Sequence, residues 1–373
     1  PAGYTGSRPF IITVPMTHPT ELNKWVYDVH AYPKNAKVNV EKEVDDAQTP
    51  AVGSPISYTI TADVPDAPVV DYYNVVDQYD KRVDLPENQI TLRMVEAKDG
   101  EVDLVKGDDY TLIPAVGKDG KTKFWTAEFT EAGRKKMIAQ RKSNDTKIVM
   151  SLEGTLKEKI GDEGLVENKA ILLPGAPANN WKPGSGEVPP PDYPNAKVVS
   201  KFGKVTITKT SSVDDTKKLQ GAEFQVYKCK PATKPANNFE SVDASLDTKL
   251  TVDGKDTFVT DDQGKVTIDG LRNNDWEDNE EVADPGYYCL VETKAPDGFE
   301  LQSRPIAFQI LASNSTEANK YTLETTVKDV PKNGGFNLPL TGAAGVGVLI
   351  GTGALLVAGS GAIVLANKRR KEQ

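Results

Sequence analysis

The sequence predicts an all-β protein built from tandem β-sandwich domains of immunoglobulin type and followed by a C-terminal transmembrane helix. Short β-prone runs separated by turn residues recur along most of the 373 residues, as they do in such sandwiches. The 25 prolines and 30 glycines suit turns and linkers better than long helices. A chain of this length predicts roughly two or three domains. Only 38% of the residues are apolar, so each core should be small.

Residues 1–35 are expected to be the end of an N-terminal domain. Residues 10–14 are β-prone, and residues 25–34 alternate apolar and polar side chains as a half-buried strand does. Pro33 prevents ladder pairing, so Lys34 should lie at a strand end or in an exposed connection. The chain does not begin with Met and shows no signal peptide, which an exported protein needs. We therefore expect a fragment that lacks its N-terminal part.

Residues 36–173 are expected to form a middle immunoglobulin-like domain, and residues 195–337 a C-terminal one. Both consist of short β-prone runs with turns between them, and only residues 130–141 look helical. Residues 174–194 contain seven prolines and have no periodic apolar pattern. This composition predicts a linker between the two domains.

The C-terminal residues predict a membrane anchor. Residues 343–366 form an uncharged apolar run of 24 residues, which as a helix would span roughly 36 Å. That length is enough to cross a hydrocarbon core of about 30 Å. The basic tail, residues 367–373, would stay in the cytoplasm. Everything before residue 338 should therefore lie outside the membrane.

The composition excludes several classes of function. The formal charge of −9 argues against nucleic acid as a partner. The two histidines, His18 and His30, are too few for a zinc site, and we expect neither metal nor cofactor. The sequence has no Gly-rich phosphate loop and no nucleophile elbow. Cys229 and Cys289 predict a disulfide in an extracellular chain, with two unlinked buried thiols as the alternative.

Residues 25–34, 288–299 and 338–342 form three distinctive motifs. Together they resemble those of the LPxTG-anchored backbone pilins, the fimbrial shaft subunits of Corynebacterium and Actinomyces. Residues 25–34 are similar to the pilin motif WxxxVxVYPK, with Ala31 where the family usually has Val. Residues 288–299 are similar to the E-box, YxLxETxAPxGY. The sorting signal that sortases read is matched by Leu338, Pro339, Leu340, Thr341 and Gly342.

The resemblance implies domains of collagen-adhesin type and a sortase substrate rather than an enzyme. A sortase would cut between Thr341 and Gly342 and join the threonyl carbonyl to Lys34 of the next subunit. Head-to-tail joining of this kind does not close, so it gives a filament. The implied partners are pilus-class and housekeeping sortases, identical subunits, tip and base pilins, peptidoglycan and, as a further candidate, a host receptor. The implied location is a wall-anchored pilus on the cell surface, preceded by a membrane-held precursor.

The resemblance also implies an internal isopeptide bond in each domain, formed autocatalytically between a lysine and an Asn or Asp beside a helper acid. In the C-terminal domain, Lys209 would be the nucleophile and Glu292 of the E-box the helper. Asp329 stands where the family usually has Asn, so the partner is either Asp329 or Asn333. A disulfide at Cys289, three residues before Glu292, would also hold the helper in place.

In the middle domain, the lysine would be Lys42 and its partner Asn168. Asp77 resembles the helper aspartate, with Asp80 as the fallback. The absence of any bond in this domain is the alternative.

Two other functions share the anchor. A monomeric wall-anchored adhesin that binds a host ligand would need the sorting signal but has no use for an acceptor lysine. A minor tip or base pilin is the other. The pilin motif ending at Lys34 favours the shaft subunit.

Overall fold

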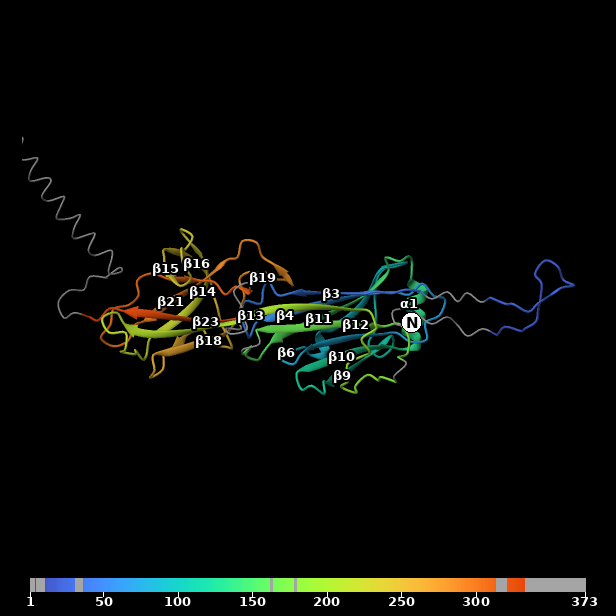
Figure 1. Cartoon of the computed structure of the whole chain (residues 1–373), viewed down its shortest axis with the longest axis horizontal. Helices are drawn as coiled ribbons and strands as arrows, with labels where there is room; N and C mark the ends of the chain where they lie inside the picture. Colours follow the sequence, from blue (N-terminus) through green and yellow to red (C-terminus); the bar gives the residue numbers. More distant parts are fainter. Residues whose placement is uncertain are drawn as a thin grey trace, which may run out of the picture.

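Two β-sandwich domains lie end to end in an elongated body, with helix α1 near one end (Figure 1). The structure, a computed structural model, describes residues 4, 11–30, 36–161, 164–177, 180–312 and 321–332. The all-β fold class predicted from the sequence is confirmed. Among these described residues, no helix is long and apolar enough to cross a membrane. The expected span, residues 343–366, lies outside them.

The middle domain consists of two facing sheets. One sheet contains β3 (Val40–Asp45), β4 (Pro55–Asp63), β11 (Lys147–Leu156), β7 (Ile90–Ala97) and β8 (Gly100–Asp103), with β6 (Val83–Asp84) on β11. The other contains β12 (Leu165–Leu173), β5 (Asn74–Asp80), β10 (Thr122–Phe129) and β9 (Tyr110–Val116). A short 3₁₀ helix, η1 (Glu87–Gln89), precedes β7. One hydrophobic core lies between the two sheets.

The C-terminal domain has the same two-sheet plan. One sheet contains β13 (Asn195–Ser211), β18 (Lys265–Arg272) and β23 (Thr322–Asp329), and through β13 it is continuous with the β12–β5–β10–β9 sheet of the middle domain. The other contains β15 (Glu240–Ser241), β22 (Ile306–Phe308), β21 (Tyr287–Lys294), β14 (Glu223–Pro231) and β16 (Ala244–Lys249), with β17 (Phe258–Val259) on β14. Two small hairpins pair β1 (Met16–Thr17) with β2 (Trp25–Val26) and β19 (Trp276–Glu277) with β20 (Glu280–Glu281).

Strand β13 belongs to both domains. Its residues 195–201 pair with β12 of the middle domain, whereas residues 204–211 pair in parallel with β23. The change from one domain to the next therefore falls inside a strand, several residues after the boundary expected at 194/195. The strand continues through this point, with a shift of register against β18 between Gly203 and Lys204, so no loop marks the change of domain.

Side chains of the β19–β20 hairpin fasten the two domains together. The Trp276 indole N–H donates to the Val199 carbonyl at 2.7 Å. Asp46 and Asp278 each accept the other's backbone N–H at 2.9 Å. Burial raises the pKa of Asp46, although neighbouring hydrogen bonds and Arg272 oppose the shift. Because these contacts add to the continuous strand β13, they restrict the movement of the two domains about their junction.

The predicted linker, residues 174–194, contains no strand or helix in its described part but is packed against the middle domain. Trp181 is buried against Phe124 and Ile171 on the outer face of the β5–β10–β12 sheet. Its indole N–H donates to the Glu187 carbonyl at 2.8 Å. We call residues 174–194 the strap. Its prolines restrict the chain, while Trp181 supplies the apolar surface that holds it down.

Helix α1 (Glu131–Gln140) confirms the helix predicted over residues 130–141. The Thr130 hydroxyl accepts the Gly133 N–H at 3.0 Å and caps the first turn. Gly133 lies against the Asp109 backbone, where an added Cβ would lie 1.9 Å from the carbonyl oxygen. A side chain at this position would push the helix off the sheet.

Replacing Trp181 by Ala should release the strap, because the indole provides both its packing and a hydrogen bond. We expect the free energy of unfolding to fall by about 3–5 kcal/mol, as for other buried aromatic truncations. Endoproteinase Glu-C should then cut after Glu187, whose carbonyl accepts the Trp181 indole N–H in the packed strap. Limited proteolysis with mass spectrometry measures this. Val188→Ala, at an exposed strap position, should leave the pattern unchanged, and equal cleavage of both variants would contradict the role of Trp181.

Candidate functional site

Three buried polar side chains meet between the two sheets of the C-terminal domain: Lys209, Glu292 and Asp329. The Lys209 ammonium contacts the Asp329 carboxylate and lies 2.9 Å from Glu292 Oε1. Lys209 and Asp329 come from the parallel neighbours β13 and β23, whereas Glu292 comes from β21 in the opposite sheet. The structure thus brings together the three residues singled out from the sequence of this domain.

Strand alternation explains why these polar side chains are buried. Successive side chains of a strand point to opposite faces, so Lys209 shares the inward face of β13 with Ile207. Glu292 likewise follows Leu290 on the inward face of β21. The Gln302 backbone N–H donates to Glu292 Oε2 at 2.8 Å and fixes the carboxylate. Ordinary amphipathic patterning therefore places the amine and the acids in the core.

Burial also decides the protonation of this cluster. Burial raises the pKa of Asp329 to about 6, and Glu292 adds to the shift while Lys209 opposes it. The carboxyl therefore keeps its proton to a higher pH than an exposed aspartate does. Isolated buried charges are costly, and moving one proton from the ammonium to a carboxylate removes both charges. The arrangement can present a neutral amine next to a protonated acid.

The middle domain contains an equivalent cluster. Lys42 Nζ lies 2.6 Å from Asp77 Oδ1, and both side chains are completely buried. Lys42 belongs to β3 in one sheet and Asp77 to β5 in the other. Asn168, also buried, lies on β12, the neighbour of β5. A lysine from one sheet therefore reaches across the core to an acid of the other sheet, as in the C-terminal domain.

Both pKa shifts in the middle cluster favour the neutral forms. Burial lowers the pKa of Lys42, and the charge of Asp77 only partly opposes this. Burial raises the pKa of Asp77, against the opposing effects of Lys42 and Asn168. Within the described residues, neither amide atom of Asn168 makes a hydrogen bond of normal geometry. The Asn168 amide nevertheless lies close enough to Asp77 and Tyr58 to oppose the rise in the pKa of both groups.

An aromatic ring accompanies each lysine, a feature that the sequence analysis missed. The Tyr58 ring centroid is 5.1 Å from Lys42 Nζ, and the Phe224 ring centroid is 5.5 Å from Lys209 Nζ. Both rings are buried on inward faces, of β4 and β14. The inward alternation of β-prone runs was the available signal, but it does not reveal which core aromatic meets which lysine.

The two fallback residues have different positions. Asp80 accepts from the Arg82 guanidinium, with Asp80 Oδ1 2.9 Å from Arg82 Nε, and is not the acid beside Lys42. Asn333 lies outside the described residues. Of the two candidate partners in the C-terminal domain, the structure describes Asp329, which contacts the Lys209 ammonium.

The predicted disulfide between Cys229 and Cys289 is confirmed, with the two Cα atoms 5.8 Å apart. It joins β14 to β21, which are neighbours in one sheet. Cys289 lies on the face of β21 opposite to Leu290 and Glu292, in a small apolar cluster of its own. The bond therefore fixes the strand that carries Glu292 without touching the buried cluster.

The residues expected to take part in intermolecular linkage lie outside the described residues. These are Lys34 and the sorting signal, residues 338–342. The described residues contain no group of His, Cys, Asp and Glu side chains that could hold a metal ion.

Comparison with known proteins identifies the family. The SpaA family, a prealbumin-like fold domain, matches residues 203–325. A fimbrial subunit type 1 of Actinomyces viscosus is 41% identical, over 97% of this chain and 70% of that protein. The chain belongs to this family of Gram-positive pilins. A fimbrial subunit type 2 of Actinomyces naeslundii is 32% identical to the pilin, over 98% of this chain and 67% of that protein.

Solved structures agree with this assignment. The fimbrial protein FimP from Actinomyces oris superposes with a TM-score of 0.68 at 36% identity, covering 89% of the pilin and 76% of FimP. The full-length major pilin SpaD from Corynebacterium diphtheriae gives a TM-score of 0.63 at 29% identity, with 89% and 77% covered. The pilin is therefore a fimbrial subunit of a surface pilus.

Without its lysine partner, Asp329 should make stability depend on pH. In Lys209→Met the effect that lowers the Asp329 pKa is gone, so the folded pKa lies even further above the usual 3.8. The unfolded chain then releases the proton at lower pH than the folded chain, and the free energy of unfolding falls as the pH rises from about 4 to 8. Urea unfolding at several pH values measures this.

Asp46 and Asp77 also have raised pKa values and contribute the same sign. The matched control is therefore Lys209→Met/Asp329→Asn, which removes only the Asp329 carboxyl. We expect the free energy of unfolding to decrease less with rising pH in this double variant than in Lys209→Met. The same decrease in both would contradict the assignment to Asp329.

Proposed function

We propose that the pilin is the shaft subunit of a covalent, wall-anchored pilus, stiffened by one isopeptide bond in each domain. The observation that carries this proposal is the pair of buried clusters, each with a lysine, an acid and an Asn or Asp. A lysine buried against a carboxyl is a costly way to stabilise a core. The clusters are better explained as the reactants of a covalent bond than as ion pairs.

In the C-terminal domain, the Lys209 amine attacks the Asp329 carboxyl carbon. The Lys209 Nζ–Cγ bond forms, the carboxyl loses its hydroxyl, and the released hydroxyl and an amine proton leave as water. Glu292 receives and returns the protons. In the middle domain, Lys42 attacks the Asn168 amide and releases ammonia, with Asp77 in the helper role. The fold holds the partners together, and such orientation can supply effective molarities of about 10⁵–10⁸ M.

The positions of the strands support head-to-tail polymerisation. The Asp46 end of β3 lies at the domain junction, so its Val40 end points away from the C-terminal domain. Strand β23 runs parallel to β13 and carries the chain towards the opposite end of the body (Figure 1). Lys34 is six residues before Val40, at most about 20 Å along the chain. Thr341 follows Asp329 by twelve residues, so donor and acceptor belong to opposite ends of a subunit.

The intermolecular step uses the sortase. Its cysteine displaces Gly342 from the Thr341 carbonyl, and the Lys34 amine of the next subunit then displaces the cysteine. An exposed lysine has a pKa near 10.4 and must lose its proton before it attacks. The sortase, tip and base pilins and peptidoglycan are the partners of this proposal. A housekeeping sortase would attach the finished shaft to the wall.

Intact mass tests the internal bonds. The reduced chain should weigh about 17 Da less for Lys42–Asn168 and about 18 Da less for Lys209–Asp329. Glu292→Gln should abolish only the loss of about 18 Da, and Asp77→Ala only the loss of about 17 Da. Glu223→Gln, at the start of β14 where Glu223 pairs with Lys294, should abolish neither mass loss. A wild-type mass equal to that of the unmodified chain would exclude both bonds.

Polymerisation tests the shaft function. In a Gram-positive host with a pilus-class sortase, the precursor should give a ladder that resists heat and detergent. Lys34→Ala and Thr341→Ala should each abolish the ladder, whereas Lys24→Ala, a salt-bridged neighbour of Glu21, should retain it. Wall-anchored single chains, unaffected by the residue at position 34, would favour the monomeric adhesin instead.

A further inference from the structure

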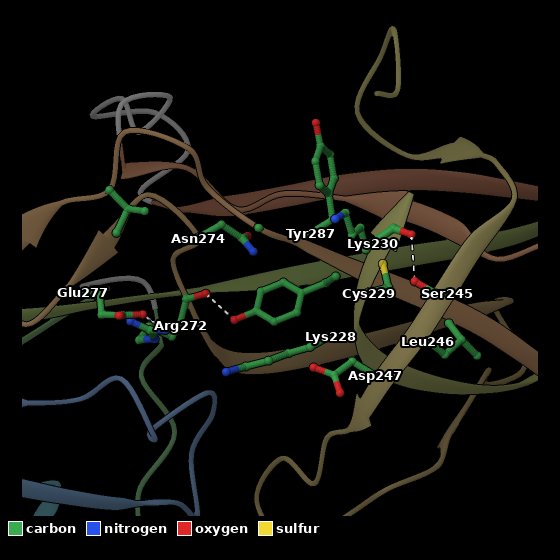
Figure 2. Close-up of a pocket in the computed structure, with 13 residues that line it drawn as sticks. Lys228, Cys229, Lys230, Ser245, Leu246, Asp247, Arg272, Asn274, Glu277 and Tyr287 are labelled. Carbon is green, nitrogen blue, oxygen red and sulfur yellow. Dashed lines mark hydrogen bonds and ion pairs between the residues drawn. The ribbon is translucent and has the colours of Figure 1, made fainter. Parts of the chain in front are cut away.

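A hollow of about 540 Å³ lies in the C-terminal domain beside the domain junction, and neither buried cluster uses it. Strands β14, β16 and β21 and the segment that follows β18 surround it (Figure 2). Its volume falls within the range of about 300–1,000 Å³ that is typical of small-molecule sites. An inorganic ion alone would leave most of it empty.

The hollow contains a half-buried ammonium group without a direct partner. The Lys228 ammonium makes no hydrogen bond and no ion pair with any residue in the described parts of the chain, although the Lys228 backbone pairs with Tyr288. Its side chain extends towards Arg272 and Glu277 (Figure 2). Burial lowers the pKa of Lys228 and the charge of Arg272 lowers it further, whereas Glu277 and Asp247 raise it. A ligand anion would supply the negative charge that this position lacks.

The neighbouring cation, Arg272, is held in place by its own contacts. Arg272 Nη2 lies 2.6 Å from Glu277 Oε2, and its Nη1 donates to the Trp276 carbonyl at 3.2 Å. The Arg272 carbonyl accepts the Tyr288 hydroxyl at 2.8 Å. Because Glu277 is held by Arg272, it does not neutralise Lys228 by direct contact. Arg272 Nη1 also lies 3.6 Å from Asp46 Oδ1, so the Arg272 charge is already matched by carboxylates, whereas the Lys228 ammonium has none in contact.

From this geometry we propose that the hollow binds an acidic sugar, with its carboxylate on Lys228 and its hydroxyl groups on the polar rim. Lys230, another cation of β14, adds to the attraction for the anion. The Asp247 carboxylate would repel a second carboxylate but can accept hydrogen bonds from sugar hydroxyls. Tyr287 offers an aromatic ring at the edge of the hollow (Figure 2).

The disulfide makes this site rigid. Cys229 lies between Lys228 and Lys230 in the lining, and its bond to Cys289 ties β14 to the strand that carries Tyr287 and Tyr288. The lining strands are therefore held in place before a ligand arrives. Pre-organisation of this kind improves affinity because less conformational freedom is lost on binding. The proposal does not depend on the isopeptide bonds or on polymerisation.

Calorimetric titration of the purified full chain tests the proposal, with glucuronic acid, glucose and glutamic acid as probes. Glucose has the same ring without the carboxylate, and glutamic acid has carboxylates without the sugar hydroxyls. We expect glucuronic acid to bind at least about tenfold more tightly than either, and its affinity to fall with added salt. Equal affinity for glucose, or for glutamic acid, would overturn the acidic-sugar assignment. No saturable binding of any probe would overturn the site.

Two variants test whether glucuronic acid binds in the hollow. Lys228→Met keeps the apolar stem but removes the charge, and should raise the Kd for glucuronic acid at least about tenfold. Lys294→Met removes an exposed lysine at the other end of β21, which pairs with Glu223 at 3.1 Å, and should leave the Kd unchanged. Circular dichroism confirms that each variant is folded. An unchanged Kd in Lys228→Met would overturn the role of the hollow.

Discussion

The burial of a lysine ammonium between two sheets is the constraint on which the rest of the structure depends. Lys42 and Lys209 have fully buried side chains, and no water is needed to explain their surroundings because an acid faces each of them. Such a pair is tolerated only where the geometry is well defined. The long paired strands on both sides of each cluster, β3 with β4 and β13 with β23, provide that definition.

The second constraint is continuity between the domains. Strand β13 pairs with β12 near its beginning and carries Lys209 near its end, so one strand connects the regions of the two buried clusters. The contacts of Trp276 and Asp278 prevent this connection from acting as a simple hinge. A rod that transmits tension benefits from such an arrangement, since noncovalent domain stability is only about 5–15 kcal/mol. The packed strap covers the sheet next to the same connection.

The surface of the pilin is specialised separately from its interior. The disulfide lies on the face of β21 opposite to Glu292. Tyr288, which lines the hollow and pairs with Lys228, shares the face of Leu290 and Glu292, so the buried cluster and the hollow lie on the same side of this strand. Alternation of side chains separates the disulfide from both, because neighbouring residues of a strand meet different environments. A buried lysine–acid cluster and a polar hollow can therefore occur in the same small domain.

Strand and helix patterning in the sequence predicted the β class and helix 130–141, and the pair of cysteines predicted the disulfide. The residues of both clusters came from the resemblance of the motifs to those of pilins, which left Asp329 and Asn333, and Asp77 and Asp80, as alternatives. The sequence did not reveal that the strap is packed by Trp181 or that β13 crosses the domain boundary. It also gave no sign of Tyr58 beside Lys42, or of the hollow near Lys228. Those features join segments far apart in the chain, and only the packing of the two sheets decides which distant side chains meet.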